Sequence, residues 1–113
     1  MKTYLVDYSE IAEAELDTIL LRMIRLSPRT ANRWQEGLTS AIEDLSSMPR
    51  RFAVAREQPD FNREVRALLY GKYRVLYTIL DTDGNGEEDT VRILHIRHGS
   101  QDFSLPTEEE LDK

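Results

Sequence analysis

Two stretches decide the fold of this 113-residue chain: VRALLYGKYRVLYTI at positions 65–79 and VRILHIRHGS at positions 91–100. Branched and aromatic residues dominate both, which is typical of β-strands. They predict strands over Arg63–Tyr70, Tyr73–Leu80 and Thr90–His98. Gly71 and Lys72 allow only a tight turn between the first two strands, and the turn-forming segment Asp81–Gly86 separates the second pair. Because both connections are short, neighbouring strands are predicted to be antiparallel.

The residues before these strands follow the period of helices. Two apolar stripes have the i, i+3, i+4 spacing of amphipathic helices. Ser9 is a capping residue for the first helix, and Ser27 followed by Pro28 starts the second. The first stripe comprises Ala12, Leu16, Ile19, Leu20 and Met23, and the second comprises Ala31, Trp34, Leu38, Ala41, Ile42 and Leu45. Because so few residues separate the stripes, the helices are predicted to form an antiparallel hairpin that ends before Pro49.

A short run at Thr3–Tyr8 precedes the helices and has the alternation of a strand. The segment between Pro49 and Asn62 lacks periodicity and is predicted to be a loop. The order of elements is therefore β-α-α-β-β-β, in the α+β class. A helical hairpin packed on one face of a curved, mainly antiparallel sheet is the simplest way to bury both stripes.

Composition narrows the class of protein. Apolar residues make up 40% and charged residues 32% of the chain, as in an ordinary globular domain. The lack of cysteine excludes disulfides and thiolate metal sites. The opening residues MKTYLVDYSE lack the apolar centre of a signal peptide, and no apolar run approaches the ~20 residues of a membrane span. These features predict a single cytoplasmic domain that does not associate with membranes.

The net charge of −6 by itself argues against a nucleic-acid partner, but the acids are concentrated in two places. The segment Asp81–Asp89 holds five acids and no base, and residues 102–113 hold five acids and one lysine. The rest of the chain carries a net charge of +3. Between Arg50 and Arg74 there are seven bases and three acids, so we expect the working surface in this basic region.

Three ordered motifs point to a family. The pattern SP..A.RW...L..AI..L...P at positions 27–49, followed by the two strand stretches, resembles the RelE/ParE superfamily of toxins from bacterial type II toxin–antitoxin systems, a plasmid stabilisation family. The most specific part is Arg66 with Tyr73–Tyr77, and the His98–Gly99 pair that closes the last strand. The resemblance spans Tyr4 to Asp102. It implies one toxin domain over residues 1–102 and an acidic C-terminal tail over residues 103–113.

The resemblance implies a toxin, without a cofactor, that an antitoxin neutralises by wrapping around it in a hetero-oligomer. Two branches share the fold. ParE-like toxins bind and inhibit DNA gyrase, whereas RelE-like toxins are metal-independent endoribonucleases that cut messenger RNA on the ribosome. A degenerate member would bind its antitoxin without attacking any target. The fold alone does not distinguish between these functions. The distinction must come from the residues of the site.

Cleavage of RNA through its 2′-hydroxyl requires a base, an acid and positive charge near the phosphate. In the ribonuclease branch, Arg66 and Arg74 would supply the charge and His98 would transfer protons. Several ribonuclease relatives carry a catalytic histidine or arginine two residues after the glycine of the last strand, where this chain has Gln101. Glutamine neither titrates nor carries charge. The sequence therefore favours the ParE-like branch, and His98 then simply closes the strand.

A target-binding toxin needs an exposed surface rather than an aligned acid and base. The candidate binding residues are Arg50, Arg51, Arg56, Tyr73, Tyr77 and Arg97. Tyr73 and Tyr77 share a strand face, which is also typical of core packing. Arg74 lies among apolar neighbours, so it either pairs with Glu64 or another carboxylate, or faces a ligand at the end of the sheet.

Two further patterns concern the last strand and the turn before it. Both faces of the last strand are mixed, so alternation does not indicate which is buried, and His95 and His98 are expected on opposite faces. The turn Asp81–Gly86 matches the first half of a calcium loop, but Arg92 stands where the loop needs a bidentate glutamate. Ordinary turn chemistry accounts for these residues, and no metal site is predicted.

Overall fold

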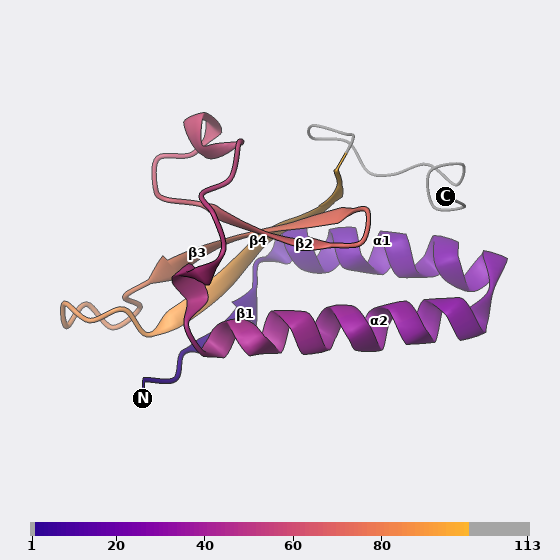
Figure 1. The fold of residues 1–113 in the computed structure, drawn as a ribbon, viewed down its shortest axis with the longest axis horizontal. Helices are drawn as coiled ribbons and strands as arrows, with labels where there is room; N and C mark the ends of the chain where they lie inside the picture. Colours follow the sequence, from indigo (N-terminus) through magenta and orange to yellow (C-terminus); the bar gives the residue numbers. More distant parts are fainter. Residues whose placement is uncertain (1, 100–113) are drawn as a thin grey trace.

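The computed structural model describes residues 2–99 and places the elements in the predicted β-α-α-β-β-β order (Figure 1). Gln101 and the predicted acidic tail lie outside the described residues. The helices and strands are β1 (Leu5–Tyr8), α1 (Glu10–Leu26), α2 (Pro28–Glu43), β2 (Arg66–Tyr70), β3 (Tyr73–Leu80) and β4 (Thr90–His98). Three 3₁₀ turns, η1 (Asp44–Ser46), η2 (Pro49–Arg51) and η3 (Gln58–Asp60), lie between α2 and β2. Within residues 2–99, no helix is long and apolar enough to cross a membrane.

The two predicted serine caps start the two helices. The Ser9 hydroxyl accepts a hydrogen bond from the Ala12 amide at 3.0 Å, and the Ser27 hydroxyl accepts one from the Thr30 amide at 3.3 Å. Ser27 is at once the C-cap of α1 and the N-cap of α2, so a single residue joins the helices. This confirms the tight antiparallel hairpin.

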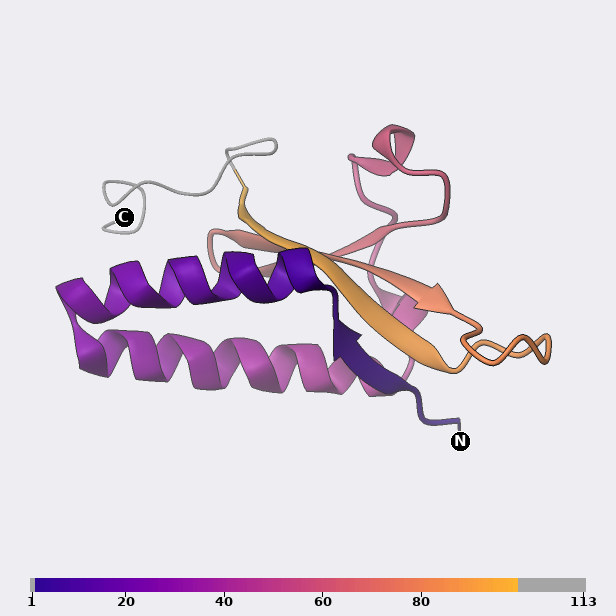
Figure 2. The same cartoon turned by 180° about the vertical axis from the view of Figure 1, so that it is seen from behind.

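The four strands form one sheet in the order β1-β4-β3-β2. β1 pairs with β4 in parallel, and the other two pairings are antiparallel. The helical hairpin is the crossover that a parallel neighbour requires. The helices cover one face of the sheet, and the segment that contains η3 lies over the other (Figures 1 and 2). The predicted α+β architecture is therefore confirmed.

The main core lies between the hairpin and the sheet. Ile19, Leu38 and Ile42 from the helices are fully buried against Val75 and Ile93 of the central strands. A second, smaller core on the opposite face packs Ala55, Val65 and Leu76 together, with Phe61, Ala67 and Leu94 around them. Both faces of β3 and β4 are therefore partly covered.

A β-bulge in β4 explains why its two faces looked mixed. His95 pairs with Leu76 and Ile93 with Tyr77, so Leu94 is the extra residue. Ile93 and Ile96 consequently both enter the main core, although three positions separate them. A regular strand would have placed them on opposite faces.

The strand predicted over Arg63–Tyr70 begins later than expected, at Arg66. The backbone of Val65 is bonded to the loop: its carbonyl accepts from the Ala55 amide, and its amide donates to the Gln58 side chain at 2.6 Å. The first strand likewise begins at Leu5 instead of Thr3, because the Tyr4 amide donates to the carbonyl of Ser46. Tertiary hydrogen bonds thus set both strand starts.

Gly37 permits a close approach between α2 and the end of β2. The Tyr70 hydroxyl lies where a Cβ on Gly37 would be, and the Tyr70 ring is edge-on to Trp34. We predict that Gly37→Ala destabilises the protein by about 1–3 kcal/mol, since overpacking outweighs the better helix propensity of alanine. Urea denaturation would measure this. The penalty should shrink in a Tyr70→Phe background, and stabilisation by Gly37→Ala in the wild-type background would contradict the account.

Candidate functional site

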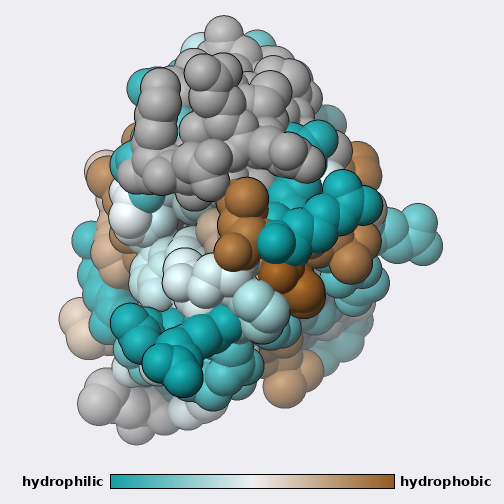
Figure 3. Space-filling view, turned by 90° about the vertical axis from the view of Figure 1, so that its right-hand side faces the viewer, coloured by the Kyte–Doolittle hydropathy of each residue, from teal (hydrophilic) through white to brown (hydrophobic). Residues whose placement is uncertain are grey.

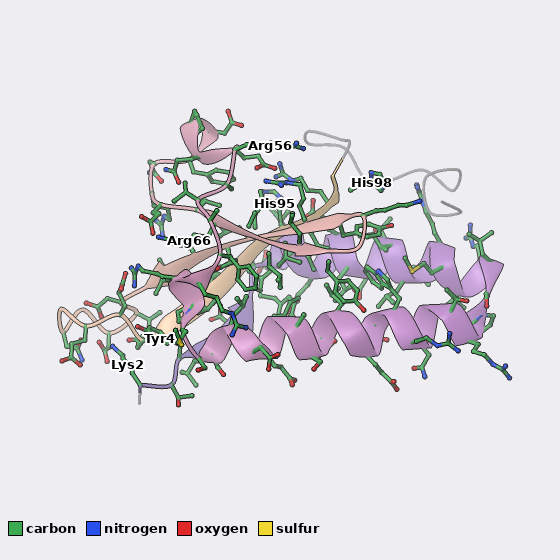
Figure 4. The ribbon with its side chains drawn as sticks, in the orientation of Figure 1. Lys2, Tyr4, Arg56, Arg66, His95 and His98 are labelled. Atoms are coloured by element: carbon green, nitrogen blue, oxygen red, sulfur yellow. The ribbon has the colours of Figure 1, made fainter. Side chains whose placement is uncertain are left out.

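A shallow pocket of about 320 Å³ lies where the β2–β3 turn meets the end of β4. Figure 4 shows Arg56, from the loop, and His98, from β4, near this end of the sheet. The pocket is lined by Arg56, Leu69, Gly71, Lys72, Tyr73, Arg74, His98 and Gly99. Two of the three predicted ribonuclease residues, Arg74 and His98, therefore line one pocket. It is the candidate functional site, and four of its lining side chains are basic or can become so.

Arg74 is held by a carboxylate that sequence reasoning did not single out. Its Nε and one terminal nitrogen donate to the two oxygens of Glu57 at 3.1 and 2.6 Å. The side chains are 13% and 6% exposed. Burial by itself raises the pKa of Glu57, but the hydrogen bonds from Arg74 and the backbone, with the nearby arginine charges, outweigh it and lower that pKa. Of the alternatives that the sequence leaves open for Arg74, the structure shows pairing with a carboxylate other than Glu64, namely Glu57.

Arg97 lies opposite Arg74 in the β3–β4 register and is 1% exposed. Burial lowers the pKa of its guanidinium, while the charges of Glu15, Glu57 and Asp60 oppose this effect. Arg97 was a candidate binding residue, yet it lies inside the molecule. A buried guanidinium beside a second one is costly without nearby carboxylates, and here Glu15, Glu57 and Asp60 supply that negative charge.

His98 packs against aromatic rings on the helix side of the sheet. Its ring is edge-on to Tyr73 with centroids 5.6 Å apart, and Tyr73 in turn is edge-on to Trp34 at 5.1 Å. His95 instead lies near Phe61 and the carboxylate of Glu15, so the two histidines do not form a pair, as predicted. The surroundings of His98 thus anchor the end of β4.

Arg66 lies apart from the pocket, at the start of β2 (Figure 4). Leu69, which pairs with Arg74, is three positions further along the strand, about 10 Å at the usual strand rise. The Arg66 guanidinium donates to the carbonyl of Phe52 at 2.6 Å and to Glu64 at 3.1 Å. Arg66, Arg74 and His98 therefore do not meet at one point. Arg66 holds the loop to the sheet.

The candidate binding arginines of the loop are each engaged differently. Arg50 donates to Glu88 of the acidic turn at 2.8 Å, and this hydrogen bond raises the pKa of Arg50 and lowers that of Glu88. Arg51 lies over the ring of Phe52, and Arg56 donates to the carbonyl of Gly99. The acidic turn therefore neutralises part of the basic surface within the molecule.

Tyr73 and Tyr77, the two candidate aromatic binding residues, are buried in the main core. The Tyr77 hydroxyl donates to the carbonyl of Pro49. Burial raises the pKa of Tyr77 to about 12, although the charges of neighbouring arginines act the other way. The hydroxyl consequently stays protonated and holds η2 against the sheet. Only the rim of Tyr73 reaches the pocket.

Glu15 is a second residue that the sequence did not indicate. Its carboxylate accepts from the Ile96 amide at 3.0 Å and contacts the His95 ring nitrogen at 3.2 Å. β1 ends at Tyr8, opposite Ile93, so the outer edge of β4 has no strand partner beyond that point. The Glu15 carboxylate, on α1, accepts the hydrogen bond that the Ile96 amide cannot donate to a neighbouring strand. No local pattern could reveal such a long-range role.

In the acidic turn, the carboxylates of Asp81, Asp83 and Asp89 lie within 4.8 Å of one another. Asp81 accepts from the amides of Gly84 and Gly86 at 2.9 and 2.7 Å, and Asp89 accepts from the Thr82 hydroxyl at 2.8 Å. These hydrogen bonds lower the pKa of both carboxyl groups. They account for the composition of the turn.

The fold and the basic pocket define a small α+β domain whose pocket-lining cations are largely engaged by the protein itself. The family described as "ParE toxin of type II toxin-antitoxin system, parDE" matches residues 6–103. The chain belongs to this family of toxins, which confirms the predicted resemblance.

Solved structures agree with this assignment. A chain of the chromosomal ParDE system from P. aeruginosa superposes with a TM-score of 0.65 at 16% identity, covering 85% of this chain and 96% of that one. A chain of the toxin–antitoxin complex RelBE2 from Mycobacterium tuberculosis gives a TM-score of 0.52 at 27% identity, covering 89% and 97%. The first likeness establishes the fold alone. No curated protein matches the sequence significantly.

The Arg74–Glu57 pair yields a stability prediction. We expect Glu57→Gln to cost about 3–5 kcal/mol at neutral pH, because it removes the carboxylate that pairs with Arg74 and one of the negative charges near Arg97. The pKa of Glu57 is lowered, so its contribution is complete above the ordinary glutamate pKa of about 4.3 and is lost as the pH falls through the lowered value. Wild type and variant should therefore converge in acid.

Denaturant titrations at several pH values would measure this difference. Glu64→Gln is the matched control, since Glu64 is half exposed and its ion pairs should contribute less than about 1 kcal/mol. Equal losses for the two variants would mean that the buried pair has no special role.

Proposed function

We propose that this chain is a ParE-type toxin that acts in the cytoplasm by binding its target protein, DNA gyrase, and performs no chemistry of its own. The observation that carries the proposal is the state of the candidate catalytic groups. Arg74 is neutralised by Glu57, His98 packs against Tyr73, and Arg66 holds the loop elsewhere. Each of these three side chains is therefore held in a contact that stabilises the fold.

The charge at the pocket also supports a binding role. Cleavage of RNA needs uncompensated positive charge to stabilise the phosphorane. Among residues 2–99, the pocket's cations without a carboxylate partner are Arg56 and Lys72, and Arg56 already donates to Gly99. A metal-independent ribonuclease would have to break these contacts first.

The ribonuclease function remains the second candidate, because the pocket does bring Arg74 and His98 together at the end of the sheet. A third candidate is a degenerate toxin that binds only its antitoxin. The three functions differ in what they attack, so direct assays of both targets separate them.

We predict that the purified chain inhibits supercoiling by gyrase and leaves ribosome-bound messenger RNA intact. His98→Gln should inhibit gyrase as strongly as wild type, since the proposal gives this ring no role in chemistry. Ribosome-dependent cleavage that His98→Gln abolishes would overturn the proposal. Absence of both activities, with normal growth on expression, would support the degenerate toxin.

We further propose that an antitoxin binds this chain in a hetero-oligomer, and the similar RelBE2 structure, which is a toxin–antitoxin complex, supports this proposal. A second hollow, of about 450 Å³, suits an acidic segment with apolar side chains. Tyr4, Met48 and Pro49 provide apolar walls, and Lys2, Arg50 and Arg51 provide positive charge. Figure 4 shows Lys2 and Tyr4 beside each other, with the Lys2 nitrogen 5.1 Å from the Tyr4 ring centroid.

A substitution at Met48 would test the proposed antitoxin site. Met48 lies in this hollow with a φ of 51°, and aspartate tolerates that left-handed region. We predict that Met48→Asp keeps the fold but weakens antitoxin binding by about tenfold, because it adds a negative charge to a site for an acidic segment. Calorimetry with the coexpressed antitoxin would measure this. Unchanged affinity would place the antitoxin elsewhere.

A further inference from the structure

The far part of the helical hairpin carries positive charge only. Residues 18–35 contain no acid and four arginines, whereas the part of α1 before residue 18 holds four acids and no base. We call residues 18–35 the hairpin tip. Its arginines are Arg22, Arg25, Arg29 and Arg33. The charge is therefore strongly polarised along the hairpin.

The hairpin tip extends beyond the sheet (Figures 1 and 2). Of the fully buried helix residues, Ala12, Leu38 and Ile42 belong to the other part of the hairpin, and Ile19 lies at the start of the tip. Within the tip, Met23 and Ala31 pack in the core cluster. Both helices are therefore longer than is required to cover the sheet.

Apolar side chains on the hairpin tip are exposed among the arginines. Leu21 is 63% exposed, and Ile24 and Leu26 are each 48% exposed. Figure 3 looks toward this end of the molecule and shows hydrophobic surface directly beside strongly hydrophilic side chains. Arginine and apolar residues together are typical of protein-binding surfaces.

Arg29 opposes the local preference of its helix. The first turn of α2 contains no acid, and Arg29 follows Pro28 there, where the helix dipole disfavours positive charge. Arg33 lies one turn further on the same face and repels it. Within residues 2–99, neither arginine forms an ion pair with a carboxylate. A local rule broken without compensation marks a functional position.

We propose that the hairpin tip is the surface with which this toxin docks onto an acidic, partly apolar surface of its target protein. The exposed aliphatic side chains favour a protein over a nucleic acid, whose backbone would engage the arginines alone. The acids at the other part of the hairpin add to this preference by repelling phosphate. This inference rests on the proposed function, because it names the surface that gyrase would contact.

The test is the double variant Arg29→Glu/Arg33→Glu. Glutamate in the first turn of α2 favours the helix dipole, so the melting temperature should stay equal or rise. Binding to purified gyrase and inhibition of supercoiling should both weaken by about tenfold or more. Arg63→Glu is the control for a single charge reversal, since Arg63 is exposed in the loop away from the tip. It should bind gyrase as wild type does.

The outcomes separate the two proposals. If the wild-type chain does not bind gyrase, the proposed function falls and this inference falls with it. If wild type and the double variant bind equally, only this inference falls. The double variant should bind gyrase more weakly than wild type even when DNA is absent. A loss seen only in the presence of DNA would show that the hairpin tip contacts nucleic acid and would overturn protein docking.

Discussion

The hydroxyl of Ser9 connects the helical hairpin to the middle of the sheet. It accepts from the Ala12 amide to start α1, and it donates to the carbonyl of the bulged residue Leu94 at 3.1 Å. The Ser9 amide also donates to Ile93. This junction lies where β1 ends and the outer edge of β4 loses its strand partner. Glu15 then satisfies the Ile96 amide, so α1 replaces a strand along the remaining edge.

The bulge at Leu94 determines what each face of the sheet carries. It sends Ile93 and Ile96 to the helices and leaves Arg97 opposite Arg74 on the other face. The two neighbouring guanidiniums are compensated by carboxylates there: Glu57 from the loop bonds Arg74, and the charges of Glu15, Glu57 and Asp60 act on Arg97. The basic pocket is thus built largely from groups that hold the sheet end and the loop together. The hairpin tip, by contrast, carries four arginines and no acid, and the binding role proposed for it does not draw on the pocket.

Much of the fold could be predicted from the sequence because its signals are local. Ser9, Ser27 and Pro28 mark the helix starts, and the two apolar stripes have helical spacing. The strand predicted over Tyr73–Leu80 likewise has these bounds in the structure. The sequence predicts the start of β2 three residues too early, because the Val65 backbone bonds to the loop, and it does not indicate which carboxylate pairs with Arg74. Hydrogen bonds between residues that are distant in the chain produce no periodic pattern in the sequence, so they cannot be predicted from it.

The element order, the helical hairpin, the family and the separation of acidic from basic segments can all be predicted from the sequence. These depend on spacing, capping and composition, which act over a few residues. Three features depend on the tertiary structure: the bulge in β4, the burial of Tyr77 and Arg97, and the pairing of Arg74 with Glu57. Each depends on which distant segments approach one another. The energy of a buried charge is set by that approach and by the water it excludes, neither of which is a property of sequence order.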